Sequence, residues 1–334
     1  MKSILVTGGA GYIGSHTCKA LARVGYQPVV FDNLSTGHRW AVRWGPLVEG
    51  DITDRRFVRE TLEKYQINAV IHFAANASVG ESMENPYKYL HDNVAGSVAL
   101  LEAMRDAGVR HIVFSSTCAT YGVPQSVPIS EMEPQTPLNP YGESKLFVER
   151  ALCWYERAYG LGWVALRYFN AAGADHDGEI GECHEPETHL IPVAVQAALE
   201  LHPAVHIMGT DYPTPDGTAI RDYIHVEDLA SAHIKALAYL DKGGQSTALN
   251  LGTAQGYSVR EVIEAVERTG GRPVPVRESP RRPGDPPVLV ADTRRAQEML
   301  SWRPSYENLD AIVSTAWQWH VSSVLISAAS GAGK

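Results

Sequence analysis

The sequence predicts an α/β protein, a Rossmann-type doubly wound parallel sheet with a smaller C-terminal α/β lobe. Two observations lead to this prediction. Short β-rich apolar runs alternate with amphipathic helical stretches in the first half of the chain, which is typical of a parallel sheet covered on both faces. From about residue 175, long loops rich in proline and glycine replace that alternation. The expected buried strands are SILVTG (3–8), PVVFDN (28–33), AVIHFAA (69–75), HIVFSS (111–116) and WVALRYFN (163–170).

The second half of the chain shows fewer but clear elements. Apolar residues recur with helical periodicity in three stretches, and one further β-rich run is present. The expected helices are 226–240, 258–270 and 307–320, and the expected strand is TALNLG (247–252). Long loops in a compact protein usually serve a function, so we expect this half to be a substrate-binding lobe.

The composition is that of an ordinary globular protein. The 334 residues are 44% hydrophobic and 20% charged, enough for a large core. A formal net charge of −9 disfavours binding to nucleic acid or to anionic membranes, because phosphates would be repelled. No apolar run has the length of a membrane span or of a signal peptide's core. The four cysteines are far apart and form no zinc pattern, so we expect no metal, reduced thiols and a cytoplasmic location.

A glycine-rich turn, VTGGAGYIGSH, joins the first expected strand to the first helix. Gly8, Gly11 and Gly14 have the spacing GxxGxxG, a variant of the dinucleotide-binding fingerprint. The glycines permit a tight turn and the close approach of a pyrophosphate, while the helix N-terminus supplies amide donors. Asp32 ends the second strand, where an acid can bind the adenosine ribose and would repel a 2′-phosphate. The sequence therefore predicts NAD as the cofactor.

The stretch NPYGESK places a tyrosine and a lysine one helical turn apart. Asn139 can cap a helix that begins at Pro140, so Tyr141 and Lys145 should share one face. A lysine charge there would lower the pKa of the phenol toward a value useful for proton transfer. Alone, this common spacing favours a structural role. The glycine turn, and SSTCAT at the end of the upstream strand, favour a catalytic role instead.

Together these motifs resemble the extended short-chain dehydrogenase/reductase family, whose triad is Ser or Thr, Tyr and Lys. The resemblance assigns the triad to Thr117, Tyr141 and Lys145. Within the family, the chain is similar to the UDP-glucose 4-epimerases from VTGGAGYIGSH through RYFNAAGA and GTDYPTPDGTAIRDYIHVEDLA to RRPGD. This implies an isomerase of galactose metabolism that acts on UDP-glucose and UDP-galactose through a transient 4-keto sugar and regenerates NAD in each turnover.

The resemblance also implies roles for individual residues. Tyr141 would take the proton of the 4-hydroxyl, Thr117 would hydrogen-bond the sugar oxygen, and Lys145 would hold the nicotinamide ribose. The other expected cofactor-binding residues are Gly8, Gly11, Tyr12, Ile13, Gly14, Asp32, Asn33, Asp51, Ile52, Phe73, Ala74, Ala75, Asn93, Ser115 and Tyr168. The other expected substrate-binding residues are Asn170, His189, Leu190, His206, Ile207, Met208, Arg221, Arg282, Asp285 and Leu289.

Within the substrate set, the roles divide between the parts of the nucleotide. Arg221 and Arg282 match residues that hold the diphosphate, for which a planar guanidinium is well suited. Asn170 matches a phosphate contact, and Asp285 matches the contact to the uridine ribose. The remaining residues match the wall around the uracil. For His189 and His206 we expect this wall role and not metal ligation, because neither has a carboxylate or cysteine partner at ligand spacing in the sequence.

Three positions depart from the family pattern or decide its details. Some relatives carry a lysine on the cofactor where this chain has Ala77, and relatives tend to show Asn-Asn where it has Asp92-Asn93. We therefore expect NAD to be held less tightly than in lysine-bearing relatives. Leu289 corresponds to the residue beside the sugar and is intermediate in size. It favours UDP-glucose and UDP-galactose and leaves UDP-N-acetylhexosamines and UDP-pentoses open as alternatives.

Three other functions fit the sequence less well than epimerisation. A nucleotide-sugar 4,6-dehydratase needs an additional acid and base, and such relatives place an Asp-Glu pair where this chain has Cys118 and Ala119. A nucleotide-sugar decarboxylase would need a cation for the substrate carboxylate, and no residue stands out for that role. A non-catalytic NAD-binding protein is disfavoured because the Thr-Tyr-Lys triad is intact.

The sequence also predicts domain boundaries and an oligomeric state. We expect an NAD-binding Rossmann domain in residues 1–174 with part of its sheet completed by later segments, a mainly nucleotide-sugar-binding lobe in 175–320, and a tail in 321–334 that is disordered or a remnant of cloning. Two helices, one near YKYLHDNVAGSVALLEAM (87–104) and one that begins in NPYGESK, are apolar on more than one side, which usually means burial on two sides. With the resemblance, this predicts a homodimer. The apolar residues in question are Leu146, Phe147, Ala151, Leu152, Trp154 and Tyr155.

Overall fold

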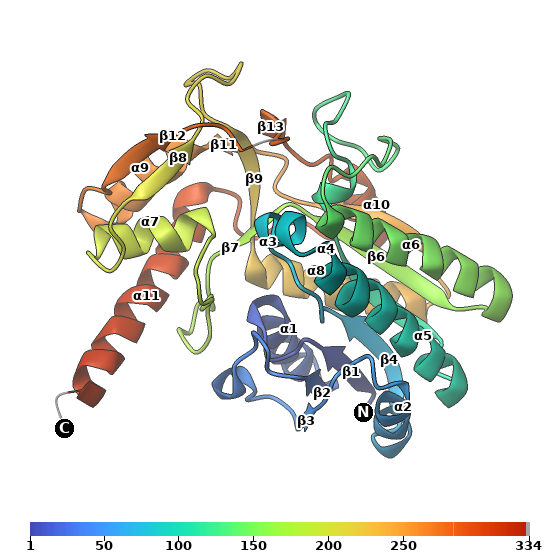
Figure 1. The fold of residues 1–334 in the computed structure, drawn as a ribbon. Helices are drawn as coiled ribbons and strands as arrows, with labels where there is room; N and C mark the ends of the chain where they lie inside the picture. Colours follow the sequence, from blue (N-terminus) through green and yellow to red (C-terminus); the bar gives the residue numbers. More distant parts are fainter. Residues whose placement is uncertain (283, 332–334) are drawn as a thin grey trace.

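A seven-stranded, wholly parallel sheet forms the centre of the larger lobe in the computed structural model, which describes residues 1–282 and 284–331 (Figure 1). The strand order is β3-β2-β1-β4-β5-β6-β10. The chain therefore leaves β1 in one direction and returns on its other side, which creates a topological switch point at β1 and β4. The strands are β1 (Ser3–Thr7), β2 (Gln27–Asp32), β3 (Leu47–Glu49), β4 (Ile67–His72), β5 (His111–Thr117), β6 (Gly162–Tyr168) and β10 (Thr247–Leu251).

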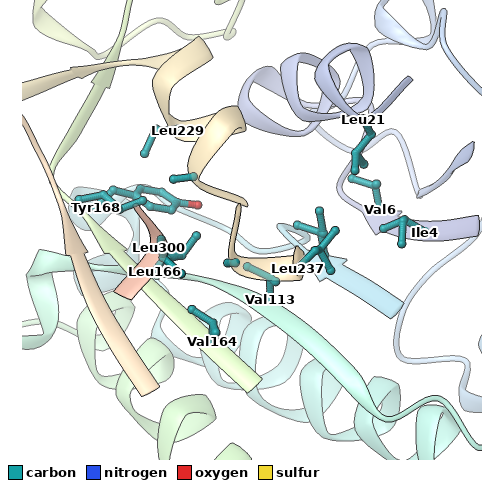
Figure 2. Close-up of a cluster of buried hydrophobic side chains, with 14 of the residues drawn as sticks. Ile4, Val6, Leu21, Val113, Val164, Leu166, Tyr168, Leu229, Leu237 and Leu300 are labelled. Carbon is teal, nitrogen blue, oxygen red and sulfur yellow. The ribbon is translucent and has the colours of Figure 1, made fainter. Parts of the chain in front are cut away.

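Helices cover both faces of this sheet, in agreement with the consecutive buried residues along its strands. In β1, Val6 faces the core under one helical layer and Leu5 faces the core under the other. Figure 2 shows the first of these cores, where side chains of β1, β5 and β6 meet those of three helices. These helices are α1 (Tyr12–Arg23), α8 (Val226–Asp241) and α10 (Arg294–Leu300). The opposite layer consists of α2 (Arg55–Lys64), α5 (Gly96–Ala107) and α6 (Pro140–Tyr159).

Short elements connect these layers on the side of α6. A π-helical segment leads directly into α5, and a single 3-10 turn follows β5. The elements on this side are α3 (Val79–Glu84), α4 (Pro86–Tyr89), η2 (Leu90–Ala95) and η3 (Cys118–Thr120). A further short element, η1 (Arg39–Ala41), follows β2 and lies near the start of α1.

The smaller lobe lies beyond the carboxyl ends of the large sheet (Figure 1). Its four-stranded sheet runs β11-β9-β13, with β7 also paired to β9, and a separate ladder joins β8 to β12. The strands are β7 (Asn170–Ala172), β8 (Val205–Met208), β9 (Ile220–His225), β11 (Gly256–Ser258), β12 (Val276–Ser279) and β13 (Val288–Leu289). Its helices, α7 (Leu190–Ala198), α9 (Val259–Gly270) and α11 (Leu309–Gly331), share a third hydrophobic core.

The fold agrees with the class predicted from the sequence, with one local difference. Each expected strand and helix is present, and β10 completes the first sheet from the second half of the chain. The expected tail begins at residue 321, but α11 continues to Gly331 because no proline or glycine interrupts residues 309–330. The rest of that tail, 332–334, lies outside the described residues. Within the described part of the chain, we find no helix with the length and apolarity needed to span a membrane.

Candidate active site

The glycine turn lies at the carboxyl end of β1, where side chains would obstruct it. Gly8 has φ +70°, and a Cβ there would lie 2.6 Å from the backbone nitrogen of Ala74. A Cβ on Gly14 would lie 2.1 Å from the carbonyl oxygen of Gly8. Gly11 forms the N-cap of α1 without a side-chain hydrogen bond, so the amides of the first turn remain available to a ligand. The turn is therefore shaped to admit a phosphate group close to its backbone.

Asp32 ends β2 beside this turn, as the sequence predicts. Its carboxylate accepts hydrogen bonds from the backbone of Ala10 at 2.9 Å and of Leu34 at 2.8 Å. Burial raises the pKa of Asp32, and the two amide hydrogen bonds act in the opposite direction. The next residue, Asn33, donates to the carboxylate of Asp51 at 2.9 Å. Asn33 thus connects the end of β2 to Asp51.

The other expected cofactor residues surround the same turn. Phe73 and Ala74 donate their backbone N–H groups to the carbonyl of Thr7, which holds the segment after β4, including the half-buried Ala75, against the glycines. Tyr12 donates from its hydroxyl to the carbonyl of Gly173 at 2.6 Å and thereby ties α1 to the loop after β7. Ile13 packs against the core under α8, and Ile52 lies 8% exposed against Gly96. A pocket opens beside the turn between α1, η1 and the loop before α7.

The predicted triad lies where the carboxyl end of β5 meets the N-terminal part of α6. Thr117 ends β5, and Tyr141 stands in the first turn of α6, capped by Asn139 as expected. Lys145 lies one turn further along α6, 3% exposed, and donates to the carbonyl of Ser115 at 2.9 Å. Its Nζ lies 6.0 Å from the centre of the Tyr141 ring. The structure therefore brings the three residues together on one edge of the sheet.

The pKa values of these residues differ from the sequence-based expectation. Burial raises the pKa of Tyr141 to about 12, although a hydrogen bond with Thr117 acts in the opposite direction. Burial also lowers the pKa of Lys145 to about 7, so near neutral pH this side chain is only partly charged. The pKa of the phenol is thus raised and not lowered as expected, because removal from water disfavours the phenolate.

Three further cofactor candidates contact this edge. Tyr168, at the end of β6, donates from its hydroxyl to the Ser115 hydroxyl. Asn93 is 1% exposed and donates to the hydroxyl of Ser144 on α6 at 3.0 Å. It also accepts from the backbone of Asn76, which follows β4. These contacts fix the ends of β4, β5 and β6 relative to α6.

A buried polar network beneath the triad was not predicted. Glu149 of α6 and Arg167 of β6 form an ion pair with side chains 6% and 7% exposed. Glu149 also accepts from the hydroxyl of Ser116, and Arg167 donates to Tyr121, whose hydroxyl donates to Asn250. A signal was present in the sequence, since an arginine inside the apolar run WVALRYF requires a buried partner.

Residues from the smaller lobe face this edge of the large sheet. Arg221 on β9 forms an ion pair with Asp285 at 2.5 Å. Leu289 on β13 lies opposite Arg221 in the parallel register and packs against the cluster that contains Cys118 and Tyr121. The exposed Arg282 accepts a backbone hydrogen bond from Asp285 in the same loop. Asn170 on β7 pairs with Tyr223 on β9. Of these five predicted substrate residues, Leu289 packs in the cluster that contains Cys118, the residue after Thr117.

The expected wall residues on β8 do not all face one way. Ile207 is 1% exposed and belongs to the core of the smaller lobe. His206 is exposed on the other face, where its Nδ1 lies 3.0 Å from the Ser279 hydroxyl, and Met208 is half-buried. A strand alternates its side chains, so the Ile207 side chain lies on the opposite face from those of His206 and Met208.

His189 has partners that the sequence spacing did not reveal. It precedes α7, which begins at Leu190, and its Nδ1 lies 2.7 Å from Glu182 and 3.3 Å from Glu187. The statement that this histidine has no carboxylate partner is therefore wrong, because the loop folds back between residues 182 and 189. Although burial opposes it, the two carboxylates raise the pKa of His189 to about 10. The pattern E-x-H-x-x-E-x-H was the available signal.

The model of the NAD dependent epimerase/dehydratase family matches residues 4–252 of this chain. The chain belongs to this family. Among curated relatives, a UDP-glucose 4-epimerase of Rhizobium leguminosarum bv. trifolii is 54% identical over 322 residues, which cover 96% of this chain and 98% of the relative.

Solved structures of the family agree with this chain in fold. The UDP-glucose 4-epimerase from Brucella ovis in complex with NAD has a TM-score of 0.93 and 56% identity, covering 95% of this chain and 98% of that one. The UDP-glucose-4-epimerase from Stenotrophomonas maltophila with bound NAD and formylated UDP-arabinopyranose has a TM-score of 0.94 and 42% identity, covering 98% and 100%. The fold class and the family expected from the sequence are confirmed.

Proposed function

We propose that this protein is an NAD-dependent isomerase that interconverts UDP-glucose and UDP-galactose by inversion at carbon 4 of the hexose. The observation that carries this proposal is the meeting of Thr117, Tyr141 and Lys145 at the carboxyl end of β5. The glycine turn lies on one side of them and the Arg221–Asp285 pair of the smaller lobe on the other. Relatives above 50% identity carry the name UDP-glucose 4-epimerase, which supports the same substrate pair.

NAD fits the residues present at the glycine turn. A Cβ on Gly8 or Gly14 would fill the space against the backbone, and Asp32 presents a carboxylate for the ribose. When bound, NAD supplies the reversible acceptance of a hydride. The chain's own residues must then bind the cofactor, exclude water and move the proton that accompanies the hydride.

Tyr141 is the residue that we assign to proton transfer. Burial raises its pKa to about 12, so its phenolate is a strong base toward the 4-hydroxyl proton, and the neutral phenol is a correspondingly weak acid on the return step. Thr117 contacts Tyr141 and can hydrogen-bond the same sugar oxygen. Lys145, with a pKa near 7, can carry or release a proton at neutral pH and is held toward the sheet edge by Ser115. These three groups suffice for the proton transfers that would accompany hydride transfer to and from bound NAD.

Inversion requires that the sugar turn while its nucleotide stays bound. Arg221 and Arg282 would hold the diphosphate, with Asn170 as a further contact and Asp285 at the uridine ribose. The pairing of Arg221 with Asp285 fixes the guanidinium before substrate arrives. Anchoring therefore comes from the smaller lobe and chemistry from the larger one, and the hexose between them is free to rotate.

The sugar range should depend on Leu289. Its side chain packs against Cys118 and its neighbours, next to Thr117, so it limits the space beside the hexose. We infer a preference for UDP-glucose and UDP-galactose; UDP-N-acetylhexosamines and UDP-pentoses are the alternatives. Replacing Leu289 by alanine should raise kcat/KM for UDP-N-acetylgalactosamine by about 10- to 100-fold relative to UDP-galactose. An unchanged ratio would show that other residues set the range.

A single NMR experiment tests the reaction. The protein is incubated with NAD and UDP-galactose, and UDP-glucose should appear until equilibrium is reached. Tyr159→Phe, at the exposed end of the same helix, serves as a matched control for Tyr141→Phe. Absence of UDP-glucose with NAD bound would refute the proposal. A 4-keto-6-deoxy product would instead identify a 4,6-dehydratase, which Cys118 and Ala119 disfavour because neither supplies the acid-base pair that elimination needs.

We also propose a homodimer formed through α6, in the cytoplasm. Leu146 and Leu152 face inward, 3% and 0% exposed, whereas Phe147 and Trp154 are 52% and 65% exposed on the outer side. Large apolar side chains one above the other on a helix surface favour a protein partner. Light scattering should give twice the chain mass, and Trp154→Glu should shift the protein toward monomer. A wild-type monomer at micromolar concentration would contradict the dimer.

A further inference from the structure

The loop that leads into α7 gathers four metal-ligating side chains within eight residues of sequence. One donor atom from each of Glu182, His184, Glu187 and His189 lies within 4.8 Å of the others. The active-site proposal uses only one of these residues, and it gives no role to the two glutamates or to His184. The cluster therefore needs its own explanation.

Burial makes the cluster unlike an ordinary surface group of acids and histidines. The carboxylates of Glu182 and Glu187 are 4% and 5% exposed, and His184 is 32% exposed. Within the described part of the chain, Glu187 Oε2 and His184 Nδ1 are buried and have no hydrogen-bond partner. They lie 3.6 Å apart as a long ion pair, and His184 Nδ1 also lies 3.3 Å from Glu182 Oε1. Because these ion pairs include no hydrogen bond to either buried atom, both atoms retain bonding capacity directed at one point, which a ligand there would satisfy.

The spacing of the donors is that of a small metal site. Zn²⁺ bound to imidazole nitrogen and carboxylate oxygen has bond lengths of about 2.0 to 2.2 Å, which places tetrahedral donors about 3.3 to 3.6 Å apart. Nδ1 of His184 lies 3.3 Å from Glu182 Oε1 and 3.6 Å from Glu187 Oε2. Nδ1 of His189 lies 2.7 Å from Glu182 Oε1, and this pair would open by several tenths of an ångström.

The two oxygens of Glu187 have different surroundings, which assigns the metal-facing one. Its Oε1 accepts backbone hydrogen bonds from Thr188 at 2.8 Å and from His189 at 3.0 Å. Its Oε2 is the unpartnered atom. The carboxylate is thus oriented from behind, in the way that outer contacts orient metal ligands.

Neighbouring elements hold the loop in this shape. Trp319 of α11 donates to the carbonyl of Glu182 at 2.9 Å, and the His38 ring lies 2.7 Å from the carbonyl of Cys183. The ring of His184 packs edge-on against Tyr12 at the glycine turn. His189, with 53% of its side chain exposed, provides a path from solvent. Three other parts of the chain therefore hold this loop in place, and the cluster is open to an entering ion.

We propose that Glu182, His184, Glu187 and His189 bind one divalent transition-metal ion, with Zn²⁺ as the best fit. Two imidazole and two carboxylate donors suit zinc in four-coordinate geometry, and the two carboxylates neutralise its charge. Each imidazole that carries a proton on Nδ1 releases it to solvent when the metal–nitrogen bond forms. The ion clamps the loop between the glycine turn and α7. Its role is structural, because all four positions are filled by protein.

Zinc content tests this proposal directly. The full-length protein is dialysed against a chelator, incubated with excess Zn²⁺, separated by gel filtration and analysed by mass spectrometry for metal. About one zinc per chain is expected. Glu187→Gln and His184→Asn should each weaken binding by at least about 100-fold, since losses of outer contacts alone reach 10- to 100-fold. Less than one fifth of an equivalent in the wild-type protein would overturn the proposal.

Three matched variants locate the ion. Glu185→Gln removes an exposed carboxylate of the same loop, Cys183→Ser removes its exposed thiol, and His176→Asn alters the separate group formed with Asp175 and Asp177. All three should bind zinc like the wild-type protein. Loss of binding in any of them, or full binding in both Glu187→Gln and His184→Asn, would place the ion elsewhere and refute the site.

Cobalt gives a second readout that does not depend on the variants. Co²⁺ in the wild-type protein should show visible absorption typical of four-coordinate geometry, without the near-ultraviolet band of a thiolate ligand. Zinc should also raise the thermal midpoint of the wild-type protein and leave that of Glu187→Gln unchanged. A thiolate band, or the same thermal shift in both proteins, would contradict the proposed ligands.

Discussion

Replacing Glu149 by glutamine should destabilise the protein by about 3 to 5 kcal/mol, because the Arg167 guanidinium would stay buried without a counter-charge. The pair is almost completely enclosed, with side chains 6% and 7% exposed. Nε of Arg167 lies 2.9 and 3.2 Å from the two carboxylate oxygens, and Nη2 lies 2.5 Å from Oε2. Breaking one side of such a pair leaves a charge that water cannot reach.

The size of the effect follows from the donors that surround the carboxylate. Arginine can only donate, and the hydroxyl of Ser116 also donates to Glu149. A glutamine keeps one acceptor oxygen but turns an NH₂ group toward donors on the other side. The thermal midpoint should therefore fall by roughly 4 to 7 °C in a protein of this size.

Thermal unfolding followed by circular dichroism measures this loss, and a double variant tests its cause. Glu149→Met/Arg167→Met should recover at least half of the stability lost in Glu149→Gln, because removing both charges leaves no unpaired ion. Glu60→Gln, in the exposed pair with Arg56 on α2, is the control and should leave the midpoint unchanged. A shift below 1 °C in Glu149→Gln, or a double variant less stable than both single ones, would refute the reasoning.

Three further predictions concern catalysis, pH and cofactor retention. Tyr141→Phe should lower kcat by about 10² to 10⁴ while NAD binding persists, measured by conversion of UDP-galactose; a smaller loss would exclude Tyr141 as the proton-transfer group. As the pH is lowered near pH 5, the free energy of unfolding should fall by about 4 kcal/mol per pH unit, measured by urea unfolding. The reason is that burial lowers the pKa of four histidines to about 3 or 4, so that they gain protons only on unfolding, whereas Asp222, raised by burial to about 6, gains one while folded. A net uptake of about three protons follows, and unchanged stability between pH 6.5 and 4.5 would contradict it; the histidines are His16, His72, His225 and His233. Ala77→Lys should tighten NAD binding by about 10-fold, measured by cofactor retained on dialysis, and an unchanged Kd would show that the missing lysine does not limit retention.

The sequence predicted those parts of the protein in which local chemistry decides the outcome. Gly8 and Gly14 could be recognised because the backbone there tolerates no Cβ, and this constraint depends on a few neighbouring residues. Asn139 and Tyr141 followed from the rules that govern a helix start. The five buried strands stood out because strands covered on both faces are continuous apolar runs.

The missed features depend on contacts between distant residues or on burial. Arg167 and Glu149 are 18 residues apart and meet only after β6 joins the sheet. The pKa of Tyr141 depends on how deeply the phenol is buried, which the spacing to Lys145 does not reveal. Glu182 reaches His189 because its loop folds back against Trp319 of the last helix. Each of these features is set by the tertiary structure.

The position of β10 affects how the protein can be made. This strand completes the edge of the first sheet beside β6, yet it follows most of the smaller lobe in the chain. The core beneath it also contains Leu229, Leu237 and Trp302. During synthesis, when the chain has been extended to residue 174, only six strands of this sheet have been made and α8 is still missing from one face. The nascent chain must wait for its second half, so a truncated first half should aggregate, and chaperones should bind the chain longest in this interval.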